Sequence, residues 1–145
     1  MIGHEILLVE DRRDDIDLTL RALKEANIAN KVNVVHDGAE ALDFIFARGQ
    51  YSSRNVKDLP VVVLLDMKLP KVDGIEVLKA IRAEENTKLL PVVIFTSSSE
   101  EKDRYNSYKF GCNSYVRKPV AFDDFAKAVK ELGVYWVLLN EPPVV

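Results

Sequence analysis

The chain contains five short apolar runs that are rich in valine and isoleucine and mostly do not alternate with polar residues. Runs of this length without alternation are typical of strands covered on both faces, and such strands occur in parallel sheets with helices on each side. The sequence therefore predicts a five-stranded parallel sheet built from residues 5–9, 32–35, 61–65, 92–95 and 114–116.

The segments after these runs carry apolar residues at helical spacing instead. Ile16, Leu20 and Leu23 recur in this way after the first run. The acidic pair before them, Asp14 and Asp15, suits the N-terminus of a helix. Five alternations of strand and helix predict a doubly wound α/β fold with right-handed crossovers. The other four helices are expected at residues 39–47, 75–81, 102–110 and 122–132.

Two segments do not follow this repeat. Residues 49–59 are polar and predict a surface loop that lengthens the connection to the third strand. The tail, residues 133–145, is apolar around Trp136 and Leu139. Either the last helix continues through Gly133 and packs back on the domain, or another subunit covers the tail. The second alternative predicts a homodimer through the last helix and the tail.

Length and composition limit the function classes. The 145 residues, 48% of them hydrophobic, can bury one core, which predicts a single domain over 1–145 with a core at about 4–132 and an extension at 133–145. With a net charge of -3 and no basic run, direct nucleic-acid binding is not expected. One cysteine excludes an internal disulfide, and no apolar run reaches the roughly 18 residues of a membrane span. We expect a cytoplasmic protein without membrane contact.

Four of the apolar runs end at polar residues of different kinds. Because the carboxyl ends of parallel strands meet at one edge of the sheet, we expect these side chains to share a site. Three clustered carboxylates repel one another at low dielectric, so a divalent cation is expected among them. The residues at this edge are Glu10 and Asp11 after the first run, Asp66 after the third, Thr96 after the fourth and Lys118 after the fifth.

Magnesium fits such an edge, since it takes oxygen ligands and keeps several waters. Asp11 and Asp66 are expected to bind it directly and Glu10 through a water, while the backbone carbonyl of Lys68 supplies a further oxygen.

The same edge suits phosphoryl chemistry. Aspartate attacks phosphorus when a metal and a lysine neutralise the charge of both partners, and Asp66 is the candidate because it ends the most apolar strand. Lys118 would balance the charge of the phosphoryl group, and Thr96 would donate a hydrogen bond to it.

The segments VEDRRDD, LLDMKLPKVDG, VVIFTSS and SYVRKP, in this order and over nearly the whole chain, resemble the receiver domain of two-component response regulators. The resemblance implies a flavodoxin-like sheet with strand order 2-1-3-4-5. The 49–59 loop, NSYVRKPV and the YWVLLNEPP ending resemble more narrowly the small regulators paired with bacterial and cyanobacterial phytochromes.

This resemblance implies a role for each residue at the edge. Asp66 would be phosphorylated by a sensor histidine kinase, such as a phytochrome, in a magnesium-dependent self-phosphotransfer followed by autodephosphorylation. Glu10 and Asp11 would form the acidic metal pair. Lys118 would hold the phosphate, followed by a cis peptide bond at Pro119.

It also implies an output. Thr96 and Tyr115 would form a switch that remodels the surface around the fourth helix, fifth strand and fifth helix, where a downstream protein target binds. Related small regulators often have Asn and Pro where this chain has Arg12 and Arg13, and Lys68 adds a further cation two residues after the acceptor. These departures bear on metal affinity and on the lifetime of the phosphoryl group.

Other interpretations remain open. Glu10 and Asp11 could simply cap the first helix, and Thr96 with the three serines after it could be an ordinary helix start. An aspartate-nucleophile phosphohydrolase usually has a second aspartate where this chain has Lys68, so that enzyme would lack its general acid. A flavin carrier would lack its phosphate-binding loop. A protein-binding module of the same fold would act without phosphorylation.

Overall fold

The structure, a computed structural model, describes residues 4–144, so residues 1–3 and 145 of the predicted domain lie outside it. One parallel sheet has the strand order β2-β1-β3-β4-β5, which confirms the predicted fold. Its strands are β1 (Ile6–Val9), β2 (Val32–Val35), β3 (Val62–Leu65), β4 (Val92–Thr96) and β5 (Ser114–Arg117). The five helices are α1 (Arg13–Glu25), α2 (Gly38–Ile45), α3 (Gly74–Ala83), α4 (Glu101–Lys109) and α5 (Phe122–Gly133).

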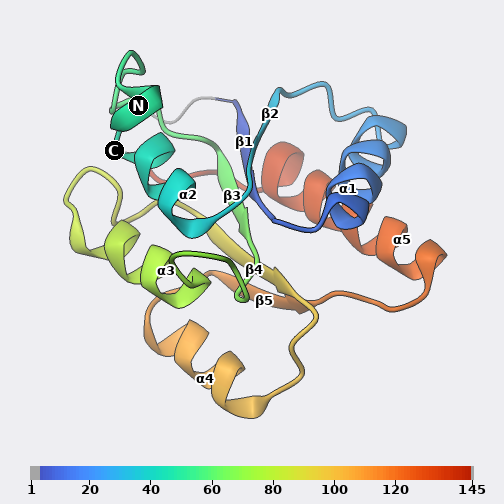
Figure 1. Ribbon diagram of the computed structural model, residues 1–145. Helices are drawn as coiled ribbons and strands as arrows, with labels where there is room; N and C mark the ends of the chain where they lie inside the picture. The colour runs from blue at the N-terminus through green and yellow to red at the C-terminus, as the bar shows by residue number, and fades with distance from the viewer. Residues whose placement is uncertain (1–3, 145) are drawn as a thin grey trace.

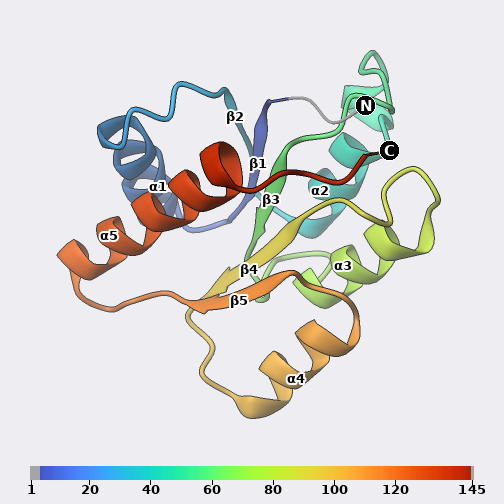
Figure 2. The ribbon, with the colours of Figure 1, turned by 180° about the vertical axis from the view of Figure 1, so that it is seen from behind.

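Both faces of the sheet are covered (Figure 1), which is why the strand sequences show no polar alternation. Helices α1 and α5 lie side by side on one face, and α2 and α3 lie on the other with α4 next to them (Figure 2). Successive strand residues feed two separate cores. Leu7 and Leu65 point to the α2 and α3 side, whereas Leu8 and Leu64 point to the α1 and α5 side.

The predicted 49–59 loop is a surface connection that begins with a short 3-10 helix, η1 (Gly49–Tyr51). It is tied to α2 by Arg54, whose guanidinium lies 3.8 Å from the centre of the Phe44 ring. Leu59, at the end of the loop, is buried in the core.

One face of the tail packs back on the domain, and the other face is left open to a second subunit. Helix α5 continues into a π-helical segment, η2 (Val134–Leu139). Trp136 and Val137 pack against the core under α1 and α5, as the first alternative requires. Tyr135, Leu138 and Leu139 remain exposed by 50%, 61% and 66%, so the other face is available to a second molecule.

The cis peptide bond expected at Pro119 is wrong, because no peptide bond in residues 4–144 is cis. The trans form is the lower-energy state of a bond to proline. None of the helices in this part of the chain has the length and apolar character required to cross a bilayer.

Candidate functional site

The polar residues at the sheet edge are held by backbone hydrogen bonds that continue the ladder past the strand ends. The amide of Glu10 donates to the Val35 carbonyl at 3.0 Å, and the amide of Asp66 donates to the Val9 carbonyl at 3.1 Å. The amide of Lys118 donates to the Thr96 carbonyl at 2.7 Å. Each side chain is therefore fixed at the edge by the same pattern that builds the sheet.

Three carboxylates meet there as predicted. Oxygen atoms of Glu10, Asp11 and Asp66 all lie within 4.8 Å of one another. Glu10 and Asp66 are buried, and Asp11 is exposed. Hard carboxylate oxygens around an open position suit Mg²⁺ or a similar divalent cation, which needs few protein ligands because it keeps waters. The residues present therefore fit the expected metal.

Lys118 lies among these carboxylates with only 5% of its side chain exposed. Its Nζ donates to Glu10 Oε1, to Asp15 Oδ2 at 2.9 Å and to Asp66 Oδ2 at 3.1 Å. Burial alone would lower the pKa of the Lys118 ammonium, but the hydrogen bonds to Glu10 and Asp15 and the charge of Asp66 raise it above its usual value. The ammonium is held in its charged form.

The pKa of Glu10 is raised as well, which in a carboxyl group favours the neutral form. Burial raises the pKa of Glu10 to about 7, because the hydrogen bond from Lys118 offsets only part of the burial and the charge of Asp66 adds to it. A carboxyl group that ionises near neutrality exchanges its proton for a metal ion at physiological pH.

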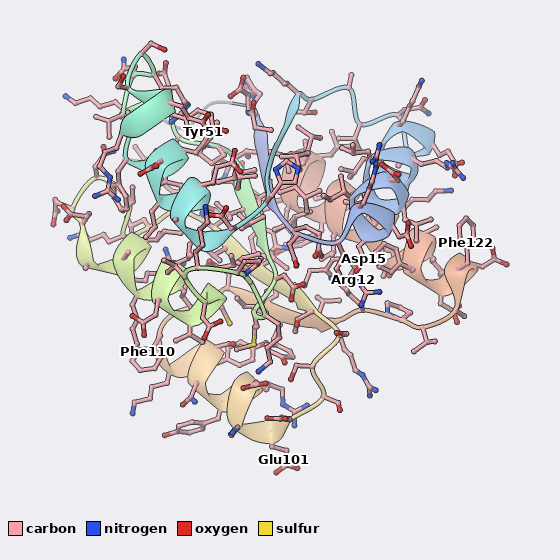
Figure 3. All side chains as sticks on the ribbon, viewed as in Figure 1. Arg12, Asp15, Tyr51, Glu101, Phe110 and Phe122 are labelled. Atoms are coloured by element: carbon pink, nitrogen blue, oxygen red, sulfur yellow. The ribbon has the colours of Figure 1, made fainter. Side chains whose placement is uncertain are left out.

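Asp15 is the site residue that sequence reasoning missed. Its acidity was assigned to the N-terminus of the first helix, which it does occupy, since α1 has Asp14 and Asp15 in its first turn. Figure 3 shows Asp15 beside Arg12 at the end of α1 that faces the sheet edge. The signal that could have found it is this position in a helix that starts only three residues after Glu10.

The loop after β3 presses closely on Asp66. The amide of Gly74 donates to the Met67 carbonyl at 3.0 Å, and a Cβ atom at position 74 would lie 2.3 Å from the Asp66 carbonyl oxygen. The amide of Lys68 lies 3.4 Å from Asp66 Oδ1. The side chain of Lys68 points toward α4, where its Nζ lies 3.7 Å from Asp103 Oδ2. The metal role of the Lys68 carbonyl stays a prediction.

Thr96 and Tyr115 are linked through one residue of the loop between β4 and α4. Thr96 is fully buried, and its Oγ1 accepts a long hydrogen bond of 3.4 Å from the Ser98 amide. The Tyr115 hydroxyl donates to the Ser98 carbonyl at 3.0 Å, and the Ser98 hydroxyl donates to Asp103 Oδ2 at 2.6 Å. Ser98 thus connects both predicted switch residues to α4.

The capping interpretations do not account for Glu10 and Thr96. The N-cap residues Arg12 of α1 and Glu100 of α4 make no side-chain capping hydrogen bond, although the Ser98 hydroxyl accepts from the Glu100 amide at 3.3 Å. Glu10 instead accepts a hydrogen bond from the Arg12 amide at 3.1 Å while it binds Lys118. A hollow of about 360 Å³ lies next to the site between α1 and the start of α5, with Arg12, Lys118 and Phe122 on its wall. Asp11 lines a different hollow, together with Arg13 and His36.

Comparisons with known proteins agree with this geometry. Residues 6–130 match the family model described as "Response regulator receiver domain". The response regulator Rcp1 of Synechocystis sp. is 36% identical over 132 residues, which is 91% of this chain and 88% of that protein. The solved Mn(2+)-bound form of Rcp1 has a TM-score of 0.90 at 34% identity and covers 98% of this chain and 100% of its own.

Two further solved structures are similar. The phosphorylated cyanobacterial phytochrome response regulator RcpA has a TM-score of 0.91 at 33% identity, covering 98% of this chain and 99% of its own. The bacteriophytochrome response regulator AtBRR is 51% identical with a TM-score of 0.74, covering 95% of this chain and 98% of its own.

Proposed function

The chain belongs to the response regulator receiver family, and from that premise we propose that Asp66 accepts a phosphoryl group from a sensor histidine kinase in a magnesium-dependent reaction. The observation that carries this proposal is the convergence of Glu10, Asp11 and Asp66 at 4.8 Å or less, with the buried ammonium of Lys118 bonded to Glu10 and Asp66. We place the reaction in the cytoplasm and assign it to one receiver domain.

The transfer follows from the charges at the edge. A carboxylate oxygen of Asp66 attacks phosphorus, the bond from phosphorus to the kinase imidazole breaks, and the imidazole leaves with its electron pair. Glu10 and Asp11 would hold the divalent cation with Asp66, and the cation supplies charge neutralisation for the phosphoryl oxygens. Lys118 gives the ammonium that balances the charge left on the acyl phosphate.

Intact mass after incubation with Mg²⁺ and a small phosphodonor tests this proposal. The wild type should gain one phosphoryl group, and Asp66→Asn should gain none because an amide oxygen is a poor nucleophile. Asp73→Asn is the matched control, since Asp73 follows in the loop before α3 and lies outside the acidic triad. Many turnovers of a phosphate ester per protein would instead support the phosphohydrolase.

We further propose that the kinase approaches through the hollow between α1 and α5. Val120 and Phe122 stand at its rim with 99% and 54% of their surface exposed, next to the buried Lys118. A phytochrome is the proposed kinase, since the similar proteins include a cyanobacterial phytochrome response regulator and a bacteriophytochrome response regulator.

Val120→Asp tests the approach. Transfer from the phosphorylated kinase should fall about tenfold or more, because an apolar contact is lost, while a small phosphodonor should react as before. Val144→Asp provides the control, since Val144 is 97% exposed in the tail. Equal loss with both donors would place the defect in the site itself.

The switch is proposed to run from Thr96 to Tyr115. Phosphorylation would draw the Thr96 hydroxyl to the phosphoryl group, which breaks its contact with Ser98 and frees Tyr115 to change position at the surface that binds a downstream protein. With Mg²⁺ and beryllofluoride, the NMR signals of Tyr115 should shift in the wild type and in Ser97→Ala. They should stay in place in Thr96→Ala.

The open face of η2 is proposed to pair with a second copy of the chain. Val134, Tyr135 and Leu139 line an almost entirely apolar hollow there, and Leu138 is exposed beside them. Leu139→Asp should shift sedimentation from dimer to monomer, whereas Leu89→Asp, at a residue that is 50% exposed in the loop before β4, should not. A wild type that stays monomeric would contradict the dimer.

A further inference from the structure

Lys118 has as many hydrogen-bond donors as carboxylate partners. An ammonium carries three N–H groups, and Nζ reaches Glu10, Asp15 and Asp66. Glu10 and Asp66 belong to the triad that can hold a metal ion, and Asp15 does not. The three partners therefore fall into two classes.

Metal binding and phosphorylation would affect these two classes of carboxylate partner differently. A divalent cation in the triad would draw the oxygens of Glu10 and Asp66 toward itself, and phosphorylation would then convert the Asp66 carboxylate into an acyl phosphate. The hydrogen bonds of Lys118 to Glu10 and Asp66 would weaken, and the buried ammonium would gain a positively charged neighbour before the phosphoryl group arrives as a new partner. A buried charge without a partner is strongly disfavoured. Asp15 is the carboxylate that can stay with Lys118 through both steps.

Asp15 also pairs with a second cation. Arg12 Nε lies 3.8 Å from Asp15 Oδ2, the same oxygen that accepts from Lys118 at 2.9 Å. Figure 3 shows Arg12 and Asp15 adjacent at the start of α1. The guanidinium, with 66% of its side chain exposed, is thereby paired with Asp15 at the start of α1. One carboxylate serves both cations.

We propose that Asp15 is a positioning residue that keeps the Lys118 ammonium in place and its charge balanced while the triad takes up a divalent cation and Asp66 accepts a phosphoryl group. This inference rests on the proposed function. Carboxylates that act from outside the ligand set commonly change metal affinity by about 10- to 100-fold when they are removed.

Mn²⁺ binding followed by electron paramagnetic resonance tests it. Asp15→Asn should weaken Mn²⁺ binding about tenfold relative to the wild type. Asp14→Asn is the matched control, because Asp14 lies in the same helical turn, is exposed and is not among the Lys118 partners in residues 4–144. It should change the affinity less than about twofold, since a surface charge interacts weakly through water. Asp15→Glu should restore most of the loss.

The dependence on Lys118 separates positioning from a general charge effect. In a Lys118→Met background, Asp15→Asn should cause no further weakening, because the ammonium that Asp15 holds is gone. Circular dichroism of each variant ensures that folded proteins are compared. Equal weakening by Asp15→Asn and Asp14→Asn, or a full effect of Asp15→Asn without Lys118, would overturn the inference alone. A wild type that neither binds Mn²⁺ nor accepts phosphate would overturn the proposed function with it.

Discussion

Helices α4 and α5 flank the same strand, β5, but they are held to the protein in opposite ways. Helix α5 buries Phe125 and Val129, and the Phe125 ring lies 5.3 Å from that of Phe95 in β4. The buried residues of α4 are Asp103 and Ser107, both polar.

The aromatic residues of α4 lie outside instead. Tyr105 and Tyr108 are exposed by 67% and 53%. Apolar burial attaches α5 to the sheet, whereas a few directional polar contacts attach α4. A helix of the second kind can shift at lower cost when charge changes at the sheet edge, because polar contacts can be exchanged one at a time.

The largest expected difference between the two helices is in stability. Phe125→Ala should cost about 3–5 kcal/mol of the free energy of unfolding, since it removes a buried aromatic ring and leaves a cavity. Urea denaturation followed by circular dichroism measures this. A cost below about 1 kcal/mol would show that α5 is no better anchored than α4.

A pH titration sharpens the comparison on the α1 and α5 side of the edge, where Glu10 lies. The pKa of Glu10 is near 4.5 in the unfolded chain and about 7 in the folded protein, so the folded state binds more protons between pH 4.5 and pH 7. The metal-free protein should therefore lose stability as pH rises through this window.

Metal binding needs the ionised carboxylate, so affinity should change in the opposite direction. We expect Mg²⁺ to bind about tenfold more weakly at pH 6 than at pH 8, measured by calorimetry, because one proton with a pKa near 7 must leave. An affinity that is constant over this range would contradict the raised pKa of Glu10.

On the α4 side, Asp103→Asn keeps the shape of the side chain and removes its charge. The hydrogen bond from Ser98 and the ion pair with Lys68 both weaken, so we expect a loss of about 1–2 kcal/mol in the free energy of unfolding. Amide exchange in residues 98–103 should rise with it. Unchanged exchange would mean that Asp103 does not hold α4 to the loop.

The smallest expected effect is at the exposed face of α4. Tyr105→Ser should change the free energy of unfolding by less than about 0.5 kcal/mol, because the ring buries little surface. Thermal unfolding of the variant checks this. A loss above about 1 kcal/mol would contradict the view that side chains on the outer face of α4 contribute little to stability through packing.

The strands could be predicted because their residues are buried on both faces, which leaves an unbroken apolar run such as that of β3. The meeting of Glu10, Asp11 and Asp66 could be predicted because parallel strands end at one edge. Helix α4 was predicted close to its observed bounds. Its attachment through Asp103 was not predicted, since an aspartate in a sequence is normally expected to be exposed.

Asp15 shows most clearly what could not be predicted from the sequence. Its partner Lys118 lies 103 residues away in the chain, and only the packed fold brings the two side chains together. The tail gave two alternatives because η2 has two apolar faces, and local sequence does not tell which of them, that with Trp136 or that with Leu139, meets the core.

Hydrogen–deuterium exchange with Mg²⁺ and beryllofluoride tests most directly whether a change of charge at the sheet edge alters the structure of α4, the more weakly anchored helix. We predict that exchange in the wild type changes in residues 97–110 and stays the same in residues 122–133. In Asp66→Asn, exchange should stay the same in both segments. Equal changes in α4 and α5, or no change in residues 97–110 of a wild type that binds beryllofluoride, would contradict this account.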